Sequence, residues 1–232
     1  MKKAVVTGVS SGLGKAITQK LLEMKFDVLG ISRSVTCKDF NHPNFHPLQV
    51  DLSDSKAVEK LCKEYAKEEI YILINCAGFG YFAPHEEISP NIIQTMTQLN
   101  LTTPMLLTNT FLRSLKKNGG YLINITSIEA LRASKFAALY SATKAGLKAF
   151  SEALFEETRK SELSITTINP DMTQSGFYDT LRFDVSEKEN EKLLASDIAD
   201  AIEHILTMRK GAVVSDYTLR SLHFGIKKKS IK

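Results

Sequence analysis

Two side chains that can carry protons, Tyr140 and Lys144, stand four residues apart in the segment L-Y-S-A-T-K-A-G. On a helix, this spacing places both on one face, a turn apart. Tyrosine, with an ordinary pKa of ~10, is a poor base near neutral pH unless a nearby ammonium favours its ionised form. Bringing that pKa to ~7 needs roughly 4 kcal/mol, which only a desolvated charge at short range supplies. If Lys144 is buried, the pair is interpreted as a proton-transfer pair. If it is not, the two residues are interpreted as unrelated neighbours on a helix.

A glycine-rich loop, T-G-V-S-S-G-L-G, follows a short β-branched run near the start of the chain. Glycines let the backbone turn sharply, and the free N–H groups at the start of the next helix suit a phosphate. The spacing differs from G-x-G-x-x-G, and no Ser or Thr follows Lys15 as a P-loop requires. The alternative interpretation of this loop is a purely structural turn between strand and helix. The residues expected to hold a dinucleotide phosphate are Gly8, Ser10, Ser11, Gly12, Leu13 and Gly14.

The end of the next expected strand carries Ser32 and Arg33 and no acidic residue. Domains that bind NAD place an acid near this point for the ribose hydroxyl, whereas an arginine suits a 2′-phosphate. The guanidinium of Arg33 offers a planar set of donors for such a phosphate. We therefore predict NADP(H) in preference to NAD(H), with a plain surface charge as the other interpretation of Arg33.

Strand and helix patterns alternate along the whole chain, which indicates parallel strands joined by crossover helices. Runs such as Ile-Tyr-Ile-Leu-Ile at 70–74 are apolar on both faces, as a sheet covered on both sides requires. We predict an α/β fold, a Rossmann-like doubly wound parallel sheet of about seven strands with helices on both faces. The expected strands are 3–7, 27–32, 48–52, 70–75, 120–126, 163–168 and 211–215. The expected helices are 13–24, 58–65, 91–116 with a bend near Pro104, 139–160 and 197–208.

The 232 residues show no internal repeat or linker, so we expect one domain over 1–232. The polar stretch 171–196 lies between a strand and a helix, where it is expected to cover a substrate. The formal charge of +4 includes a basic tail at 226–232. This tail is interpreted as solvated and not as a nucleic-acid patch, because no basic stripe with aromatics accompanies it.

Composition also excludes several classes of protein. No apolar run approaches the ~18 residues of a membrane span, and the start of the chain lacks a signal peptide, so a cytoplasmic location is expected. The five histidines show no metal-ligand spacing, and no metal site is predicted. The three cysteines have no paired spacing and fit reduced thiols.

These motifs, in this order and at these distances, resemble the short-chain dehydrogenase/reductase family over nearly the whole chain. The glycine loop matches the family's cofactor loop, and N-C-A-G at 75–78 matches its N-N-A-G or N-A-A-G element. Asn100 falls where the family has a helix asparagine. Ser127 stands thirteen residues before Tyr140, the family spacing, and Tyr140 and Lys144 match its Y-x-x-x-K motif.

The resemblance implies hydride transfer between a nicotinamide and a small carbonyl or alcohol, in a homodimer or homotetramer built on the two long helices. It assigns catalysis to Ser127, Tyr140, Lys144 and Asn100, with Lys144 also holding the cofactor ribose and Asn100 a water that links Lys144 to solvent. The other cofactor contacts that it implies are Asp51 and Leu52 at the adenine, Asn75, Ala77 and Gly78 in the cleft, and Pro170, Thr173 and Ser175 near the nicotinamide.

Two residues depart from the family pattern on the substrate side. Asp171 replaces the glycine that usually follows Pro170, and Glu129 stands where the family more often has something small and uncharged. Glu129 is interpreted either as an acid that meets a cationic or polyol substrate or as a solvent-facing loop charge. Segments 79–82, 128–138 and 177–194 are expected to line the substrate pocket. A 3-oxoacyl-carrier-protein reductase and a catalytically idle NADP-binding regulator are the alternative functions.

Overall fold

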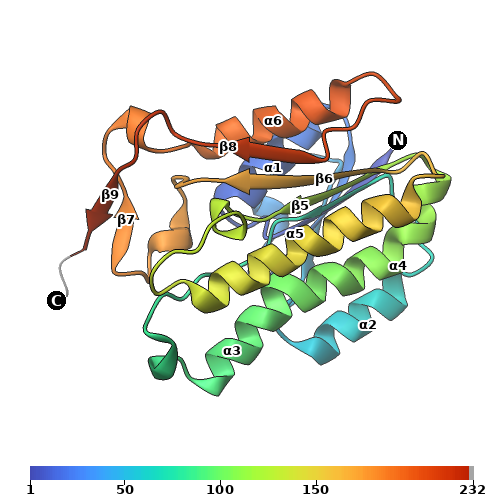
Figure 1. Cartoon of the computed structure of the whole chain (residues 1–232). Coiled ribbons are helices and arrows are strands. Elements are labelled where there is room, and N and C mark those ends of the chain that lie inside the picture. The colour runs from blue at the N-terminus through green and yellow to red at the C-terminus, as the bar shows by residue number, and fades with distance from the viewer. Residues whose placement is uncertain (230–232) are drawn as a thin grey trace.

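The computed structural model describes residues 1–229, and its centre is a parallel sheet of seven strands (Figure 1). The strands lie in the order β3-β2-β1-β4-β5-β6-β8, which confirms the predicted doubly wound α/β fold. Their bounds are β1 (Lys3–Thr7), β2 (Asp27–Ser32), β3 (Phe45–Gln49), β4 (Ile72–Asn75), β5 (Tyr121–Ile125), β6 (Ser164–Pro170) and β8 (Asp216–Leu219).

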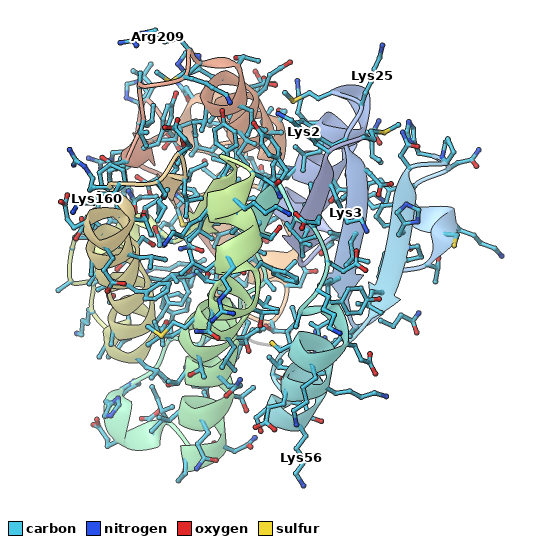
Figure 2. All side chains as sticks on the ribbon, turned by 90° about the vertical axis from the view of Figure 1, so that its right-hand side faces the viewer. Lys2, Lys3, Lys25, Lys56, Lys160 and Arg209 are labelled. Atoms are coloured by element: carbon cyan, nitrogen blue, oxygen red, sulfur yellow. The ribbon has the colours of Figure 1, made fainter. Side chains whose placement is uncertain are left out.

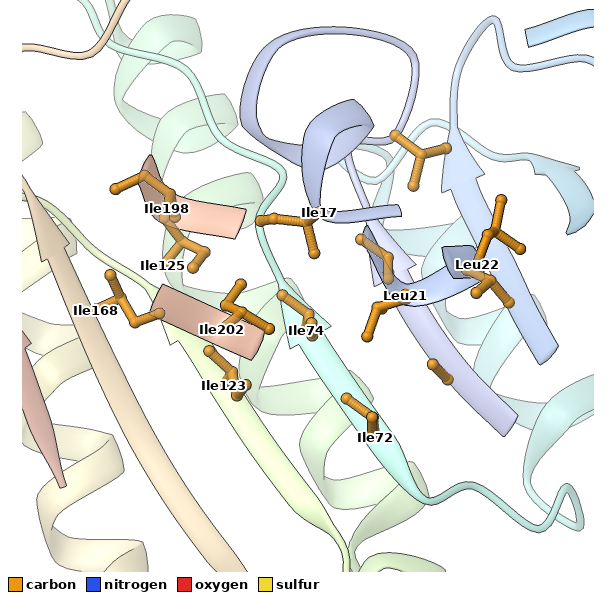
Figure 3. Close-up of a cluster of buried hydrophobic side chains, with 14 of the residues drawn as sticks. Ile17, Leu21, Leu22, Ile72, Ile74, Ile123, Ile125, Ile168, Ile198 and Ile202 are labelled. Carbon is orange, nitrogen blue, oxygen red and sulfur yellow. The ribbon is translucent and has the colours of Figure 1, made fainter. Parts of the chain in front are cut away.

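Helices cover both faces of the sheet (Figure 1). One face packs against α1 (Gly12–Glu23) and α6 (Ala195–Thr207), and the other against α2 (Ser55–Tyr65), α4 (Thr103–Lys117) and α5 (Ala138–Thr158). On the first face, Ile17 of α1 and Ile202 of α6 meet Ile74 and Ile123 of the sheet (Figure 3). This double cover explains why whole strands, such as Ile72–Asn75, are buried.

Side-chain caps begin two of the helices. The carboxylate of Asp54 accepts the N–H groups of Lys56 and Ala57 at the start of α2. The hydroxyl of Ser89 accepts the N–H of Ile92, with Pro90 in the first turn of α3 (Pro90–Thr97), where its missing N–H costs nothing. In contrast, Ser11 makes no side-chain cap to α1, so the N–H groups of that helix start stay available to a ligand.

Two strands lie a few residues from their predicted positions. The predicted strand 48–52 is wrong by three residues, because β3 begins at Phe45, whose ring packs into the core against Phe40 with centroids 4.4 Å apart. The predicted strand 211–215 is wrong as well, since β6 pairs instead with β8 at Asp216–Leu219. The amide of Asn169 donates to Asp216 and Thr218, which anchors the later segment.

The predicted long helix 91–116 is divided in two. A wide π-helical turn, Gln98–Thr102, separates α3 from α4 just before Pro104. Proline has no N–H to donate, so the regular ladder of hydrogen bonds does not need to continue through this point. The wide turn holds Asn100, which is buried. Such turns often mark functional sites in proteins.

A small antiparallel pair that the sequence analysis did not predict joins β7 (Phe183–Val185) to β9 (Ile226–Lys228), beyond the carboxyl ends of β6 and β8 (Figure 1). Lys227 bonds to Glu187 at 2.5 Å, and Lys229 lies 3.2 Å from Asp184 and donates to the carbonyl oxygen of Tyr178 at 2.5 Å. Residues 226–229 thus pair with the segment around β7, while Ile226–Lys228 themselves remain exposed to solvent, as predicted. Residues 230–232 lie outside the described residues.

Two searches of the described residues gave negative findings. None of the helices within 1–229 is long and apolar enough to cross a membrane. No group of three or more His, Cys, Asp or Glu side chains in the same range has the geometry to hold a metal ion.

Candidate active site

A cleft of about 620 Å³ opens at the carboxyl ends of β1, β4, β5 and β6. It lies where the strand order reverses between β1 and β4, which is the usual ligand site of an open α/β sheet. Apart from Asn75 and Asn100, every predicted site residue lines it. These lining residues are Gly8, Ser10, Ser11, Gly12, Leu13, Gly14, Ser32, Arg33, Asp51, Leu52, Ala77, Gly78, Ser127, Tyr140, Lys144, Pro170, Thr173 and Ser175.

The glycine loop connects β1 to α1 through a backbone that side chains would block. Gly8 has a positive φ of 77°, in the left-handed region that favours glycine. A Cβ on Gly14 would lie 2.2 Å from the carbonyl oxygen of Gly8, so the first turn of α1 packs directly on the loop. The uncapped N–H groups of α1 follow immediately. This arrangement suits a phosphate group.

Gly14→Ala is expected to disrupt this loop. The added methyl group has to displace the Gly8 backbone, since a carbon–oxygen distance of 2.2 Å is not tolerated. We expect cofactor affinity to fall by at least about tenfold, with a loss of stability of about 1–3 kcal/mol from the overpacking. Titration of NADPH fluorescence and thermal melting measure the two effects. Gly146→Ala is the matched control, because its Cβ would meet only the flexible Leu101 side chain at 3.3 Å.

Ser32, the last residue of β2, and Arg33, directly after it, also line the cleft. The Ser32 hydroxyl oxygen is buried and has no hydrogen-bond partner among the described residues. An orphaned buried hydroxyl beside an arginine fits a phosphate or hydroxyl of a bound ligand. Asp51 lies opposite, where the hydroxyl and N–H of Ser53 donate to its carboxylate and hold its pKa below the ordinary value. The residues present therefore fit the adenosine half of a dinucleotide.

Tyr140 lies on α5 with its ring between Phe82 and Phe177, at centroid distances of 5.3 and 5.8 Å. The residue is only 7% exposed. Burial raises the pKa of Tyr140 above its ordinary value, and a hydrogen bond with Ser127 acts in the opposite direction. Because desolvation is the larger effect, the phenol of Tyr140 keeps its proton at neutral pH. This protonated state is the form that can donate to a substrate oxygen.

Lys144 lies one turn further along α5 and is 4% exposed, buried by the protein's own atoms. Its Nζ lies 5.8 Å from the centroid of the Tyr140 ring and donates to the carbonyl oxygen of Ile125 at 3.0 Å. Burial lowers the pKa of Lys144 to about 8, and the nearby thiol of Cys76 opposes this shift. The condition that Lys144 be buried is met by the protein's own atoms, and with a pKa of about 8 its ammonium is still mostly charged at pH 7.

Asn75 and Asn100 lie behind the cleft wall. The amide of Asn100 accepts the N–H of Phe79 at 3.1 Å, and donates to the Phe79 carbonyl at 3.0 Å and to Thr143 at 3.2 Å. It thereby ties the loop after β4 to helix α5. Asn75 donates to Asn124 across the sheet. The role of Asn100 in a water relay stays a prediction.

Glu129 and Asp171 are both buried, with side chains 11% and 4% exposed. The carboxylate of Glu129 accepts hydrogen bonds from Arg132 and from two serine hydroxyls. The interpretation of Glu129 as a solvent-facing charge is therefore wrong. Asp171 caps its own bend by accepting the N–H of Met172, and Arg132 and Arg220 both approach it. The φ of Asp171 does not lie in the left-handed region, so this bend does not require glycine.

The cleft lining also includes residues that the sequence analysis did not name one by one. Phe79, Phe177, Tyr178 and Thr180 line the cleft from segments expected to do so, whereas no residue of 128–138 lines it. Thr95 and Leu99 enter from α3 and the wide turn, and only their closeness to Asn100 along the chain could have suggested them. The other unpredicted lining residues are Ser34, Val50, Ser53, Cys76, Ile125, Thr126, Asp171 and Gly176.

Residues 2–186 match the family model described as short chain dehydrogenase. An uncharacterized oxidoreductase of Staphylococcus epidermidis is 28% identical over 227 residues, which cover 94% of this chain and 96% of the relative. A second uncharacterized oxidoreductase, from Staphylococcus haemolyticus, is 29% identical over 225 residues, with the same two shares covered.

Two solved structures share the fold. An alcohol dehydrogenase from the archaeon Thermococcus sibiricus, complexed with 5-hydroxy-NADP, is 25% identical with a TM-score of 0.84. The alignment covers 96% of this chain and 97% of that one. Serine dehydrogenase from Escherichia coli is 21% identical with a TM-score of 0.79, covering 94% and 96% of the two chains. The second likeness carries the fold alone.

Proposed function

The chain belongs to the short chain dehydrogenase family, and we propose that it is an NADP(H)-dependent reductase of small carbonyl compounds or dehydrogenase of the corresponding alcohols. The observation that carries this proposal is the presence of Ser127, Tyr140 and Lys144 together in one cleft with the glycine loop. We further propose that 1–232 act as one dinucleotide-binding and catalytic domain, with 171–196 covering the substrate. Cytoplasmic location and a homo-oligomeric state stay predictions from the sequence.

In the proposed mechanism, a bound nicotinamide supplies or accepts the hydride. Tyr140 gives its proton to the carbonyl oxygen, for which a phenol kept protonated by burial is suited. Ser127 orients that oxygen and stabilises the charge that develops on it. Lys144 would hold the ribose hydroxyls of a bound cofactor, and its ammonium compensates the phenolate that forms when Tyr140 has lost its proton.

NADP(H) is proposed because β2 ends in Ser32 and Arg33 with no acid. The alcohol dehydrogenase from Thermococcus sibiricus, which is complexed with 5-hydroxy-NADP, supports this choice. Replacing Arg33 by Ala is expected to raise the dissociation constant of NADPH by about 10–100-fold and that of NADH by less than about threefold, as for the loss of a charged hydrogen bond. Isothermal titration with both cofactors measures the ratio. Similar NADPH and NADH affinities in the unmodified protein would contradict the preference.

Two alternative functions have less support. A reductase of carrier-bound 3-oxoacyl groups needs a basic docking face for its acidic carrier, and Lys227 and Lys229 of the basic tail are paired with Glu187 and Asp184. A catalytically idle regulator would need no proton donor, yet Ser127, Tyr140 and Lys144 are all present.

The proposal is tested by following NADPH absorbance with a panel of aldehydes, ketones and oxo acids. Carbonyl-dependent oxidation of NADPH is expected for at least part of the panel. Absence of turnover with every carbonyl, and with the corresponding alcohols and NADP⁺, in a protein that binds NADPH would instead favour the regulator.

A further inference from the structure

Four charged side chains form a cluster at the edge of the cleft, on loops that follow three different strands. Glu129 and Arg132 follow β5, Asp171 follows β6 and Arg220 follows β8. Asp171 itself lines the cleft, and Glu129 stands two residues after Ser127. The cluster therefore reaches the cleft through Asp171, while Glu129, Arg132 and Arg220 lie behind that residue and do not line the cleft.

Both carboxylates of the cluster are already occupied by the protein. Glu129 accepts from the Nε of Arg132 at 3.0 Å, from Ser134 at 2.9 Å and from Ser141 at 3.4 Å. Asp171 accepts the N–H of Met172 through Oδ1, and its Oδ2 lies 3.3 Å from the Nε of Arg220. Neither acid is free to meet a cationic substrate, which removes that interpretation of Glu129.

The two arginines keep unused donors. A guanidinium carries five N–H groups, and within residues 1–229 the hydrogen bonds of Arg132 and Arg220 use Nε alone. The only further contact of their Nη groups with a carboxylate there is the 3.9 Å approach of Arg132 Nη2 to Asp171. Their side chains are 38% and 59% exposed. The two guanidinium groups are thus held beside Asp171, which lines the cleft, although neither arginine lines the cleft itself.

We propose that Arg132 and Arg220 bind a carboxylate of the substrate, so that the substrate is a short oxo acid or the corresponding hydroxy acid. This inference rests on the proposed function. The ketone of the oxo acid is reduced to an alcohol at the expense of NADPH and one proton, while the carboxylate is unchanged. Guanidinium groups bind carboxylates through paired, parallel hydrogen bonds.

The rest of the substrate side of the cleft makes this contact more selective. Its lining includes Phe79, Leu99, Phe177 and Tyr178, none of which carries a charge at neutral pH. An ion pair is stronger beside such apolar walls than in open water. The arginines are therefore the specificity-determining groups for the acid, while the aromatic walls limit its size.

The test compares each acid with its uncharged ester. NADPH oxidation is measured with acetoacetate and methyl acetoacetate, and with longer homologues of each pair. We expect kcat/KM for the best acid to exceed that of its ester by at least about tenfold, as a charged hydrogen bond gives. An ester preference throughout the series would overturn the proposal.

Three variants then ask whether the arginines cause the preference. Arg220→Met and Arg132→Lys are expected to lower kcat/KM for the acid by about 10–100-fold, because KM for the acid rises. In the same variants, kcat/KM for the ester is expected to change by less than about threefold. The double variant Glu129→Gln with Arg132→Met removes both partners, so no buried carboxylate is left unpaired. Equal losses of kcat/KM for acid and ester would show that the arginines only stabilise the local structure, and would contradict the proposal.

Arg209→Met is the matched control. Arg209 lies just after α6, on the side of the molecule where β1 begins, together with Lys2 and Lys3 (Figure 2). The Arg209→Met substitution removes one arginine charge without altering the cluster. The ratio of kcat/KM for the acid to kcat/KM for its ester is therefore expected to stay at the wild-type value. A fall in the ratio in this variant as large as that in Arg220→Met would contradict the assignment of the effect to the cluster.

A binding experiment separates this inference from the proposed function. In the presence of NADP⁺, butyrate is expected to raise the melting temperature, butyramide is not, and Arg220→Met removes the butyrate effect. If no carbonyl is reduced, the proposed function fails while a butyrate-specific shift still supports the carboxylate site. No shift from butyrate, or equal shifts from both compounds, overturns the site.

Discussion

Tyr140→Phe is expected to lower kcat for carbonyl reduction by about 10²–10⁴-fold, the range that a positioned general acid contributes. The ring lies between Phe82 and Phe177, so phenylalanine keeps the packing and loses only the hydroxyl. KM for the carbonyl and the affinity for NADPH are therefore expected to change little. Steady-state kinetics together with NADPH titration separate the lost proton transfer from lost binding.

Tyr65→Phe is the matched control for this substitution. Tyr65 ends α2 and packs against the core on the far side of the sheet from α1, without lining the cleft. The Tyr65→Phe substitution also removes a phenolic oxygen, and it is expected to leave kcat unchanged. Near-normal turnover in Tyr140→Phe would show that another group protonates the substrate oxygen.

Lys144→Met is expected to abolish activity and, at the same time, to stabilise the protein at pH 7 by about 1–3 kcal/mol. Wild-type Lys144 is buried with one hydrogen bond, to the Ile125 carbonyl, which compensates its ammonium poorly. Methionine has a similar length and no charge to desolvate. Urea denaturation of both proteins measures the difference.

The pH dependence of this difference follows from the lowered pKa. Below about pH 8, the folded wild type carries the buried charge and its full cost. Between about pH 8 and the ordinary value of 10.5, the unfolded chain binds more protons than the folded one, so wild-type stability rises with pH. The advantage of Lys144→Met is therefore expected to shrink over that window. An advantage that grows with pH, or none at pH 7, would contradict an uncompensated buried ammonium.

Lys148→Met provides the control with the opposite expectation. Lys148 lies one further turn along α5 and pairs with Glu152 at 2.6 Å and with Asp216. Its ammonium gains partners on folding, so its removal is expected to destabilise the protein slightly, by about 0–1 kcal/mol. The two substitutions exchange the same side chains on the same helix, and only the environment of the charge differs.

The cleft was predictable because its residues stand at the ends of strands. Gly8, Gly78 and Ser127 each follow one strand of a parallel sheet and Ser32 ends another, and the carboxyl ends of these strands meet at one edge. Alternating strand and helix patterns identify such ends to within a few residues. The same local signals predicted that Tyr140 and Lys144 share a helix face.

Long-range pairings left no local signal. The contact of Asp171 with Arg220 and the pairing of β7 with β9 join residues more than forty positions apart, and nothing near either partner indicates the other. The start of β3 at Phe45 follows from register against β2 and from the packing of its ring. The lowered Lys144 pKa depends on how many neighbours bury it, which no spacing in the sequence specifies.

The pairing of β7 with β9 also determines when the cleft can be completed during synthesis. The ribosome makes the chain from its N-terminus, so β1 to β6 are all made before residue 171. The segment that carries Phe177 and Tyr178 follows at once, but its antiparallel partner, Ile226–Lys228, emerges some forty residues later. The glycine loop and Tyr140 are therefore synthesised before the strand that pairs with the segment carrying Phe177 and Tyr178.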